Sequence, residues 1–302
     1  MCSNGSWPAL FQPARPAGRA KAVYVEAKSL MPTLRVNGYD MAYVEQSAGA
    51  PLLLVHGTLC DYRHWSGQMA PLGAHYRTIA LSLRHCWPEQ WDGEGDDFTV
   101  QQHTADVASF ISALGAGPVH LIGHSRGGHI AFRVAQNFPD LIRTLILVEP
   151  GGALAPDLEA KLAPGDPLIE IGPLYAKAAE QIRGGEIDEG LKTVMEVTGG
   201  PGTWDRTPER FRQYRRDNAR TLIGQIKESR APFARADAGA IRAPTLLLAG
   251  ERSPASFHRI LDGLATAIKD VRRAVVPKAS HSSNIDNPGA FAREVLEFLD
   301  GR

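Results

Sequence analysis

Short, mostly apolar runs recur along this chain, and they limit its possible folds more than any other feature. Such a run is typical of a strand covered on both faces, as in a parallel sheet. Segments with the apolar spacing of helices separate most of them. The runs span residues 52–55, 76–83, 119–122, 145–148, 245–248 and 273–276.

Two further strands are expected at residues 33–36 and 40–45, because these segments alternate around Asn37-Gly38, a dipeptide that favours tight hairpin turns. Alternating strands and helices predict an α/β fold with a mostly parallel, doubly wound sheet of eight strands flanked by helices. Besides a helix directly after Ser125, amphipathic helices are expected at residues 100–114, 256–268 and 289–299.

Residues 151–243 are too long a stretch for a plain crossover between two strands. We interpret this stretch as a helical cap, inserted after the sixth strand over the carboxyl edge of the sheet, where open α/β sheets bind ligands. An independent second domain is the alternative. Its helices are expected at residues 156–163, 173–183, 186–197 and 207–229. The remaining chain divides into a loosely ordered leader, residues 1–32, and an α/β core, residues 33–150 and 244–302.

The five residues Gly123-His124-Ser125-Arg126-Gly127 lie between an apolar run and a helical segment. A serine in this strand–turn–helix context has its hydroxyl exposed at the tip of a sharp turn, where a base and a substrate carbonyl can both reach it. The small residues on either side allow chain to pass close to chain. The motif therefore predicts that Ser125 is a nucleophile.

Two other motifs follow the same order as in a known family. The His56-Gly57 pair closes the third strand, and Ser280-His281 precedes Asp286-Asn287-Pro288 near the carboxyl end. With the serine motif, these residues make the chain resemble a capped α/β-hydrolase-fold enzyme from about residue 33 onward. The resemblance implies a serine hydrolase, and the position of Thr58 resembles that of an oxyanion-hole donor in the family.

A serine hydroxyl needs a base to accept its proton during attack. His281 is the candidate base, because it combines a late position in the chain with a polar loop after a strand. His124 is expected to pack beneath the turn, and His56 to form structural hydrogen bonds. The backbone amide of Arg126, the residue after the nucleophile, is the second oxyanion donor beside Thr58.

A carboxylate must orient the base, and here the sequence departs from the commonest pattern of the family. Ser253 stands where an aspartate is usual, after the penultimate strand. Glu149, at the carboxyl end of the strand that follows the serine helix, is the preferred acid, as in some capped members of the family. Glu251 is the runner-up and Asp286 is third.

Aromatic and basic residues near these motifs are candidates for substrate binding. Trp65, Trp87 and Trp91 could wall an apolar pocket, and Arg84 or Arg126 could meet a carboxylate or carbonyl. Core packing or surface ion pairing would explain these residues equally well.

A serine nucleophile disfavours epoxide and haloalkane hydrolysis, because in this fold these reactions proceed through an alkyl-ester intermediate formed on an aspartate. We therefore expect hydrolysis of a small, fairly apolar carboxylic ester or lactone through an acyl-enzyme. Carbon–carbon bond hydrolysis of a diketone-like acid and a ligand sensor with little turnover are the alternatives.

Bulk composition adds limits on partners and location. Lysine plus arginine (33) balances aspartate plus glutamate (33), so no long-range field favours nucleic acid or an anionic membrane. The three cysteines lack metal-ligand spacing, and no phosphate-cradling loop is present. We expect no cofactor, no metal and a small-molecule substrate. We also expect a cytoplasmic location, since the N-terminal stretch lacks the apolar segment of a secretory signal. A homodimer stays open.

Overall fold

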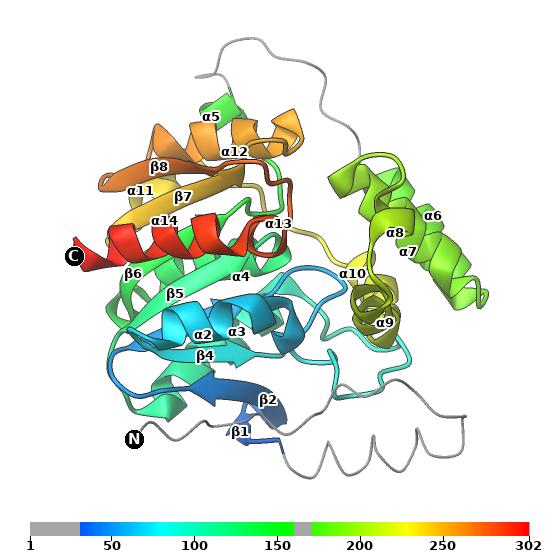
Figure 1. The fold of residues 1–302 in the computed structure, drawn as a ribbon, viewed down its shortest axis with the longest axis horizontal. Coiled ribbons are helices and arrows are strands. Elements are labelled where there is room, and N and C mark those ends of the chain that lie inside the picture. Colours follow the sequence, from blue (N-terminus) through cyan, green and yellow to red (C-terminus); the bar gives the residue numbers. More distant parts are fainter. Residues whose placement is uncertain (1–30, 160–170, 302) are drawn as a thin grey trace. The chain divides into compact units, whose positions relative to one another are not determined.

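The computed structural model describes residues 31–159 and 171–301, and the unit that carries the site begins at Thr33. Its centre is an eight-stranded sheet in the order β1-β2-β4-β3-β5-β6-β7-β8, which confirms the predicted fold class (Figure 1). The pairs β1–β2 and β2–β4 are antiparallel, and the other pairs are parallel. The strands are β1 (Thr33–Val36), β2 (Tyr39–Gln46), β3 (Pro51–Val55), β4 (Arg77–Leu81), β5 (Val119–His124), β6 (Ile142–Val148), β7 (Thr245–Gly250) and β8 (Val271–Val276).

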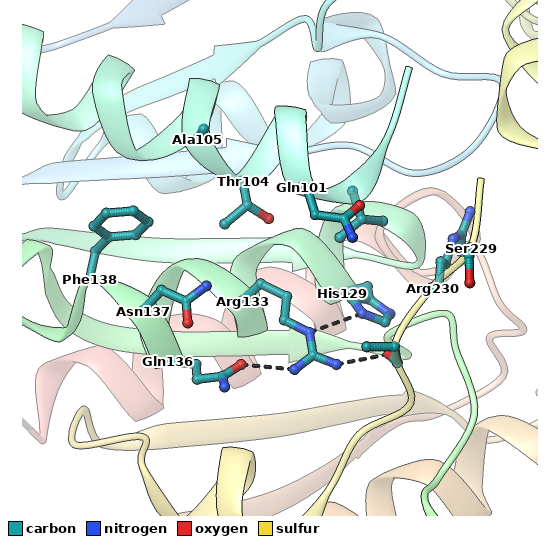
Figure 2. A pocket seen from close by; sticks show the side chains of 12 residues that line it. Gln101, Thr104, Ala105, His129, Arg133, Gln136, Asn137, Phe138, Ser229 and Arg230 are labelled. Atoms are coloured by element: carbon teal, nitrogen blue, oxygen red, sulfur yellow. Dashed lines mark hydrogen bonds between the residues drawn. The ribbon is translucent and has the colours of Figure 1, made fainter. Parts of the chain in front are cut away.

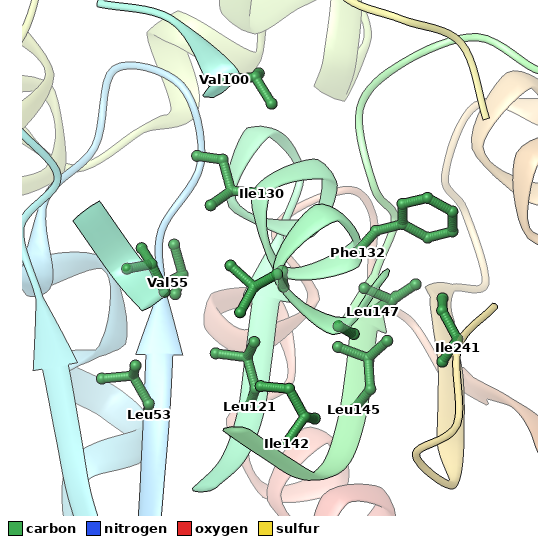
Figure 3. Packing of buried hydrophobic residues seen from close by; sticks show 14 of the residues in the cluster. Leu53, Val55, Val100, Leu121, Ile130, Phe132, Ile142, Leu145, Leu147 and Ile241 are labelled. Carbon is green, nitrogen blue, oxygen red and sulfur yellow. The ribbon is translucent and has the colours of Figure 1, made fainter. Parts of the chain in front are cut away.

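The central strands are apolar throughout because both of their faces are covered. Leu53 and Val55 of β3 pack on one side with Ile130 of a flanking helix (Figure 3), whereas Leu52 and Leu54 pack on the other. The side chains of Leu52, Leu53, Leu54 and Val55 are fully buried, and each such burial contributes about 2 kcal/mol. The unbroken apolar run thus follows from the alternation of side chains along a strand.

Helices cover the sheet on both sides. The face of Leu53 carries α3 (Val100–Leu114), α4 (Arg126–Asn137) and α12 (Ala255–Ala265), and the opposite face carries α2 (Ser66–Gly73) and α14 (Pro288–Asp300). The bounds of α3 match the prediction because local signals set them. Thr99 caps its first turn, accepting a hydrogen bond from the Gln102 amide, and Gly115 ends it in the left-handed conformation (φ 61°).

The segment between β6 and β7 is helical, as expected from its length. Its helices are α5 (Pro156–Glu159), α6 (Ile171–Arg183), α7 (Ile187–Gly199), α8 (Thr203–Arg206), α9 (Glu209–Asp217), α10 (Thr221–Gln225) and α11 (Arg235–Gly239). Residues 160–163 of the first predicted helix lie outside the described part of the chain. Helices α6, α7 and α10 share a separate apolar cluster with Leu59, from the loop after β3. These helices of the insertion therefore pack against the loop after β3.

The prediction of a single helix over residues 207–229 is wrong. The helical segment is interrupted at Asn218, whose side-chain amide donates to the Tyr214 carbonyl and to Asp61 Oδ2 at 2.7 and 2.6 Å. Asn218 Oδ1 also accepts a hydrogen bond from the Trp87 amide at 2.8 Å. These tertiary contacts outweigh the local helical preference, since asparagine side chains compete well for backbone groups. No helix in the described residues is long and apolar enough to cross a membrane.

Candidate active site

Ser125 lies at the sharp turn between β5 and α4. Its backbone has φ 53° and ψ −117°, a conformation that is strained for a residue with a side chain. Close packing holds it there, because a Cβ atom at Gly123 would lie 2.3 Å from the Gly127 carbonyl oxygen, and one at Gly127 would lie 2.3 Å from that of His56. Only glycine fits these two positions. Ser125 itself is partly exposed between buried neighbours.

His281 lies in the loop after β8, and its ring is fixed from several sides. Its Nδ1 lies 2.6 Å from Glu149 Oε2, and the ring stacks on Phe257 with centroids 4.1 Å apart. His124 Nε2 donates to the His281 carbonyl at 2.8 Å. Because an ionised carboxylate can only accept, Nδ1 carries the proton of the neutral imidazole, and Nε2 is left with a free lone pair.

Glu149 follows β6 directly and is fully buried. Its Oε1 accepts a hydrogen bond from the Gly250 amide at 2.7 Å. Burial opposes ionisation, but the hydrogen bonds from His281 and Gly250 outweigh it and hold the pKa of Glu149 below its ordinary value. The structure therefore holds an ionised carboxylate against the imidazole.

The other two candidate acids do not reach His281. Glu251 is exposed, and its Oε2 accepts a hydrogen bond from the Lys278 amide at 2.7 Å. Asp286 Oδ2 accepts from both the amide and the hydroxyl of Ser280, at 2.8 and 2.7 Å. Both carboxylates thus bind the chain just before His281, at Lys278 and Ser280, rather than its ring.

The remaining histidines near the turn have structural contacts. His56 Nδ1 donates to the Gly57 carbonyl at 2.9 Å, and its Nε2 accepts from the Leu83 amide at 3.0 Å. Burial lowers the pKa of His56 to about 4, so that its ring stays neutral. Burial and the nearby His281 hold the pKa of His124 well below its ordinary value. Neither ring is suited to act as a general base, because both nitrogens of His56 are hydrogen-bonded and the unpartnered Nδ1 of His124 is buried.

The loop after β3 passes directly beside the nucleophile. A Cβ atom at Gly57 would lie 3.0 Å from the Cβ of Ser125, so the next residue, Thr58, follows at the edge of the site. Thr58 Oγ1 donates to Gln225 Oε1 of α10 at 2.9 Å. The Arg126 side chain points away into a fully buried ion pair with Glu228 and lies 3.2 Å from His103 Nδ1. The Arg126 guanidinium therefore binds Glu228 and His103 inside the protein rather than a substrate.

The family model described as "Alpha/beta hydrolase family" matches residues 52–294, which include all of these motifs. The chain belongs to this family. An uncharacterized protein of Mycobacterium tuberculosis is 34% identical to this chain over 124 residues, which cover 40% of this chain and 36% of that protein. The match thus spans only about a third of the first curated relatives.

Solved structures extend the likeness to the whole fold. The enol-lactonase from Burkholderia xenovorans has a TM-score of 0.70 and 22% identity, covering 89% of this chain and 100% of that one. Carboxylesterase CesB from Bacillus subtilis has a TM-score of 0.70 and 17% identity, covering 94% and 98%. At these identities the similarity establishes the shared fold.

Two of the side chains expected to bind substrate lie in the core or in a buried ion pair of this chain. Trp65 is fully buried in the core cluster on the α2 and α14 side, tilted against Phe291 at 6.1 Å. Arg84 forms a two-pronged ion pair with buried Asp106, at 2.8 and 3.1 Å. Core packing and ion pairing therefore account for both residues, and the structure does not bring them to Ser125.

The other two tryptophans lie in the long loop after β4. The guanidinium of Arg63 lies 4.1 Å over the Trp87 ring. Trp91 stacks on His85 and Phe98, with centroids 4.3 and 5.3 Å apart, and Phe98 in turn lies 4.7 Å beneath the guanidinium of Arg126. This loop therefore braces the inserted helices and the buried Arg126 side chain.

A groove of about 300 Å³ opens elsewhere, between α3, α4 and residues 229–231 (Figure 2). Arg133 is its best-anchored side chain, since it donates to Gln136 at 2.8 Å and to His129 Nε2 at 3.3 Å. No candidate catalytic residue lines this groove. It is separate from the site around Ser125.

Several residues of the site escaped the sequence reasoning. Gln225 and Glu228 come from the insertion, and Phe257 begins α12. None belongs to a motif, and their neighbours in sequence give no signal of chemistry. Only the packing of the insertion on the core brings them to the turn.

Proposed function

We propose that this hydrolase cleaves a small carboxylic ester or lactone through an acyl-enzyme. Ser125 is the nucleophile, His281 the base, and Glu149 the acid that orients it. The backbone amides of Thr58 and Arg126 form the oxyanion hole. The observation that carries the proposal is the 2.6 Å hydrogen bond between His281 Nδ1 and the buried carboxylate of Glu149, because it leaves Nε2 ready to accept a proton.

The reaction follows from these roles. His281 Nε2 removes the proton of Ser125 Oγ as the oxygen attacks the scissile carbonyl, and the two amides stabilise the oxyanion by about 3 to 4 kcal/mol each. The tetrahedral intermediate collapses, the alkoxide leaves with the proton from His281, and an acyl-serine remains. A water molecule then gives a proton to His281 and attacks the acyl carbon. The second tetrahedral intermediate collapses, Ser125 Oγ takes the proton back from His281, and the carboxylic acid leaves.

The nucleophile's chemistry favours carbonyl substrates over epoxides. An acyl ester of serine hydrolyses by the same machinery that forms it, whereas an alkyl ether of serine would not. Two proteins of similar fold are named as an enol-lactonase and a carboxylesterase, which agrees with this choice. Residues 151–243 act in the proposal as a cap that supplies the far wall of the substrate site.

A fluorophosphonate probe and short p-nitrophenyl esters test the proposal. We expect stoichiometric labelling at Ser125, and an acyl burst that Ser125→Ala abolishes. Ser109→Ala, on partly exposed α3, is the matched control and should keep both signals. Absence of labelling and of acylation by every ester and lactone tried would refute the hydrolytic role of Ser125.

A further inference from the structure

Arg215 of α9 reaches from the insertion to the loop beside the nucleophile. Its Nη1 donates to the Thr58 carbonyl at 3.3 Å and to Cys60 Sγ at 3.2 Å. Thr58 is the proposed oxyanion donor, and Gly57 packs against Ser125. The guanidinium therefore contacts the same loop that packs against the nucleophile.

No acid compensates this charge. Among the residues that the structure describes, no carboxylate oxygen lies within 4.0 Å of the Arg215 guanidinium, and its Nε is buried without a partner. Asp61, on the same loop, is held by Arg63 at 2.7 Å. Arg216, the next residue of α9, is paired with Asp188 at 2.6 Å. Arg215 thus differs from the paired arginines around it.

Cys60, which contacts Arg215, and Tyr175, which lies within reach of its charge, are themselves neutral. Burial raises the pKa of the Cys60 thiol, so the sulfur does not act as a counter-anion. Burial also raises the pKa of the Tyr175 phenol, against the opposing positive charges of Arg230 and Arg215. Arginine stays protonated under all ordinary conditions. The side of the site toward the insertion is therefore positively charged.

A second arginine strengthens this charge. Glu228 pairs with both Arg126 and Arg230, so a single carboxylate serves two guanidinium groups there. Arg215 adds a third, and Tyr175 feels the fields of both Arg230 and Arg215. An enclosed guanidinium without a counter-anion is costly unless a ligand supplies one.

We propose that Arg215 binds a carboxylate carried by the substrate, so that the preferred substrates are esters or lactones with a second, ionised acid group. This inference rests on the proposed hydrolase function. It replaces the fairly apolar substrate expected from the sequence. Arg215 is partly exposed where α9 meets the loop that carries Thr58, and its fork of donors matches a carboxylate.

Matched pairs of p-nitrophenyl esters test the proposal. The acidic members are the mono-p-nitrophenyl esters of glutaric, adipic and pimelic acid, and the neutral members are the same compounds with the free acid methylated. We expect kcat/KM to favour the acidic member of at least one pair by tenfold or more. Arg215→Met should remove this preference, with a loss of kcat/KM at least tenfold larger for the acidic ester than for the neutral one.

Controls separate the possible failures. Arg210→Met, an exposed arginine of the same helix, should keep the preference, and Arg215→Lys should keep part of it. If Arg215→Met fails to fold, the wild-type pairs and Arg215→Lys still decide. A wild-type enzyme without preference for any acidic ester, or equal losses on both members of a pair, overturns the role of Arg215. Labelling of Ser125 by the uncharged fluorophosphonate reports separately on the hydrolase function.

Discussion

Glu149 Oε2 lies 2.6 Å from His281 Nδ1, although 132 residues separate the two along the chain. Ser253 stands after β7, where the commonest pattern of the family has an aspartate, and the carboxylate of Glu149 contacts the ring instead. Strand β6 lies between β5 and β7 in the sheet, so a residue at its carboxyl end is close to both the serine turn and the loop after β8. Neighbouring strands can therefore present the acid from either side.

Glu149→Gln should lower kcat at least a hundredfold, because an amide can neither stabilise the imidazolium nor hold the same tautomer. Circular dichroism and thermal unfolding would show that the fold is intact. Glu251→Gln is the matched control, since this exposed glutamate braces the neighbouring loop. Near-normal turnover of Glu149→Gln, or an equal loss in Glu251→Gln, would remove Glu149 from the triad.

Stability should fall below pH 6.5 in part through His56. Its pKa is lowered to about 4 in the fold, from an ordinary value of 6.5, because burial disfavours the charged ring. The unfolded chain therefore binds more protons between these values. The stabilisation is complete above pH 6.5 and is lost as the pH falls toward 4, with a slope of up to about 1.4 kcal/mol per pH unit.

Urea unfolding of wild type and His56→Gln at several pH values between 4.5 and 7.5 measures this slope. The variant should lose the contribution of one proton from the slope, whatever its stability at neutral pH. An unchanged slope would mean that His56 titrates alike in both states. Other buried histidines, among them His120, keep some pH dependence in the variant.

The buried pair Arg126–Glu228 should be more costly to break than to replace. Only 1% and 2% of the two side chains are exposed, so Glu228→Gln leaves a guanidinium in the interior. We expect a loss of about 3 to 5 kcal/mol in the free energy of unfolding, whereas the double variant Arg126→Met/Glu228→Met, which leaves only the partly exposed Arg230 without its carboxylate, should lose less than Glu228→Gln alone.

Chemical denaturation of the single and double variants gives the coupling energy of this pair. Asp40→Asn, which breaks the exposed pair with Arg35, is the comparison and should cost less than about 1 kcal/mol. Additive effects of the two buried substitutions would contradict the coupling.

Gly127→Ala should destabilise the hydrolase strongly or prevent its folding. The added Cβ would lie 2.3 Å from the His56 carbonyl oxygen and 2.4 Å from that of Val55, and backbone atoms cannot move away easily. Gly67→Ala, at an open position in α2, should be neutral or slightly stabilising. The yield of soluble protein and the midpoint of thermal unfolding compare the two. Equal midpoints would show that the backbone relaxes around the turn.

Most of the architecture could be predicted because its signals are local. The caps Thr99 and Gly115 determine the ends of α3, and the five residues around Ser125 mark a strand, a turn and a helix. The position of Glu149 at the end of an apolar run was enough to propose it as the partner of His281, since parallel strands end at one edge of the sheet. Each inference needed only neighbouring residues and the topology of alternating strands and helices.

The sequence by itself determined the sheet, the turn at Ser125 and the short choice of acids, because periodicity, capping and tight turns depend on residues a few positions apart. Only the tertiary structure decided which acid meets His281, which arginines have carboxylate partners, and that the helix predicted over residues 207–229 ends at Asn218. Arg84 and Arg215 look alike in sequence, yet Asp106 neutralises the first and no described carboxylate neutralises the second. Such pairing depends on which distant segments the fold brings within about 4 Å of each other, the range over which ion pairs form.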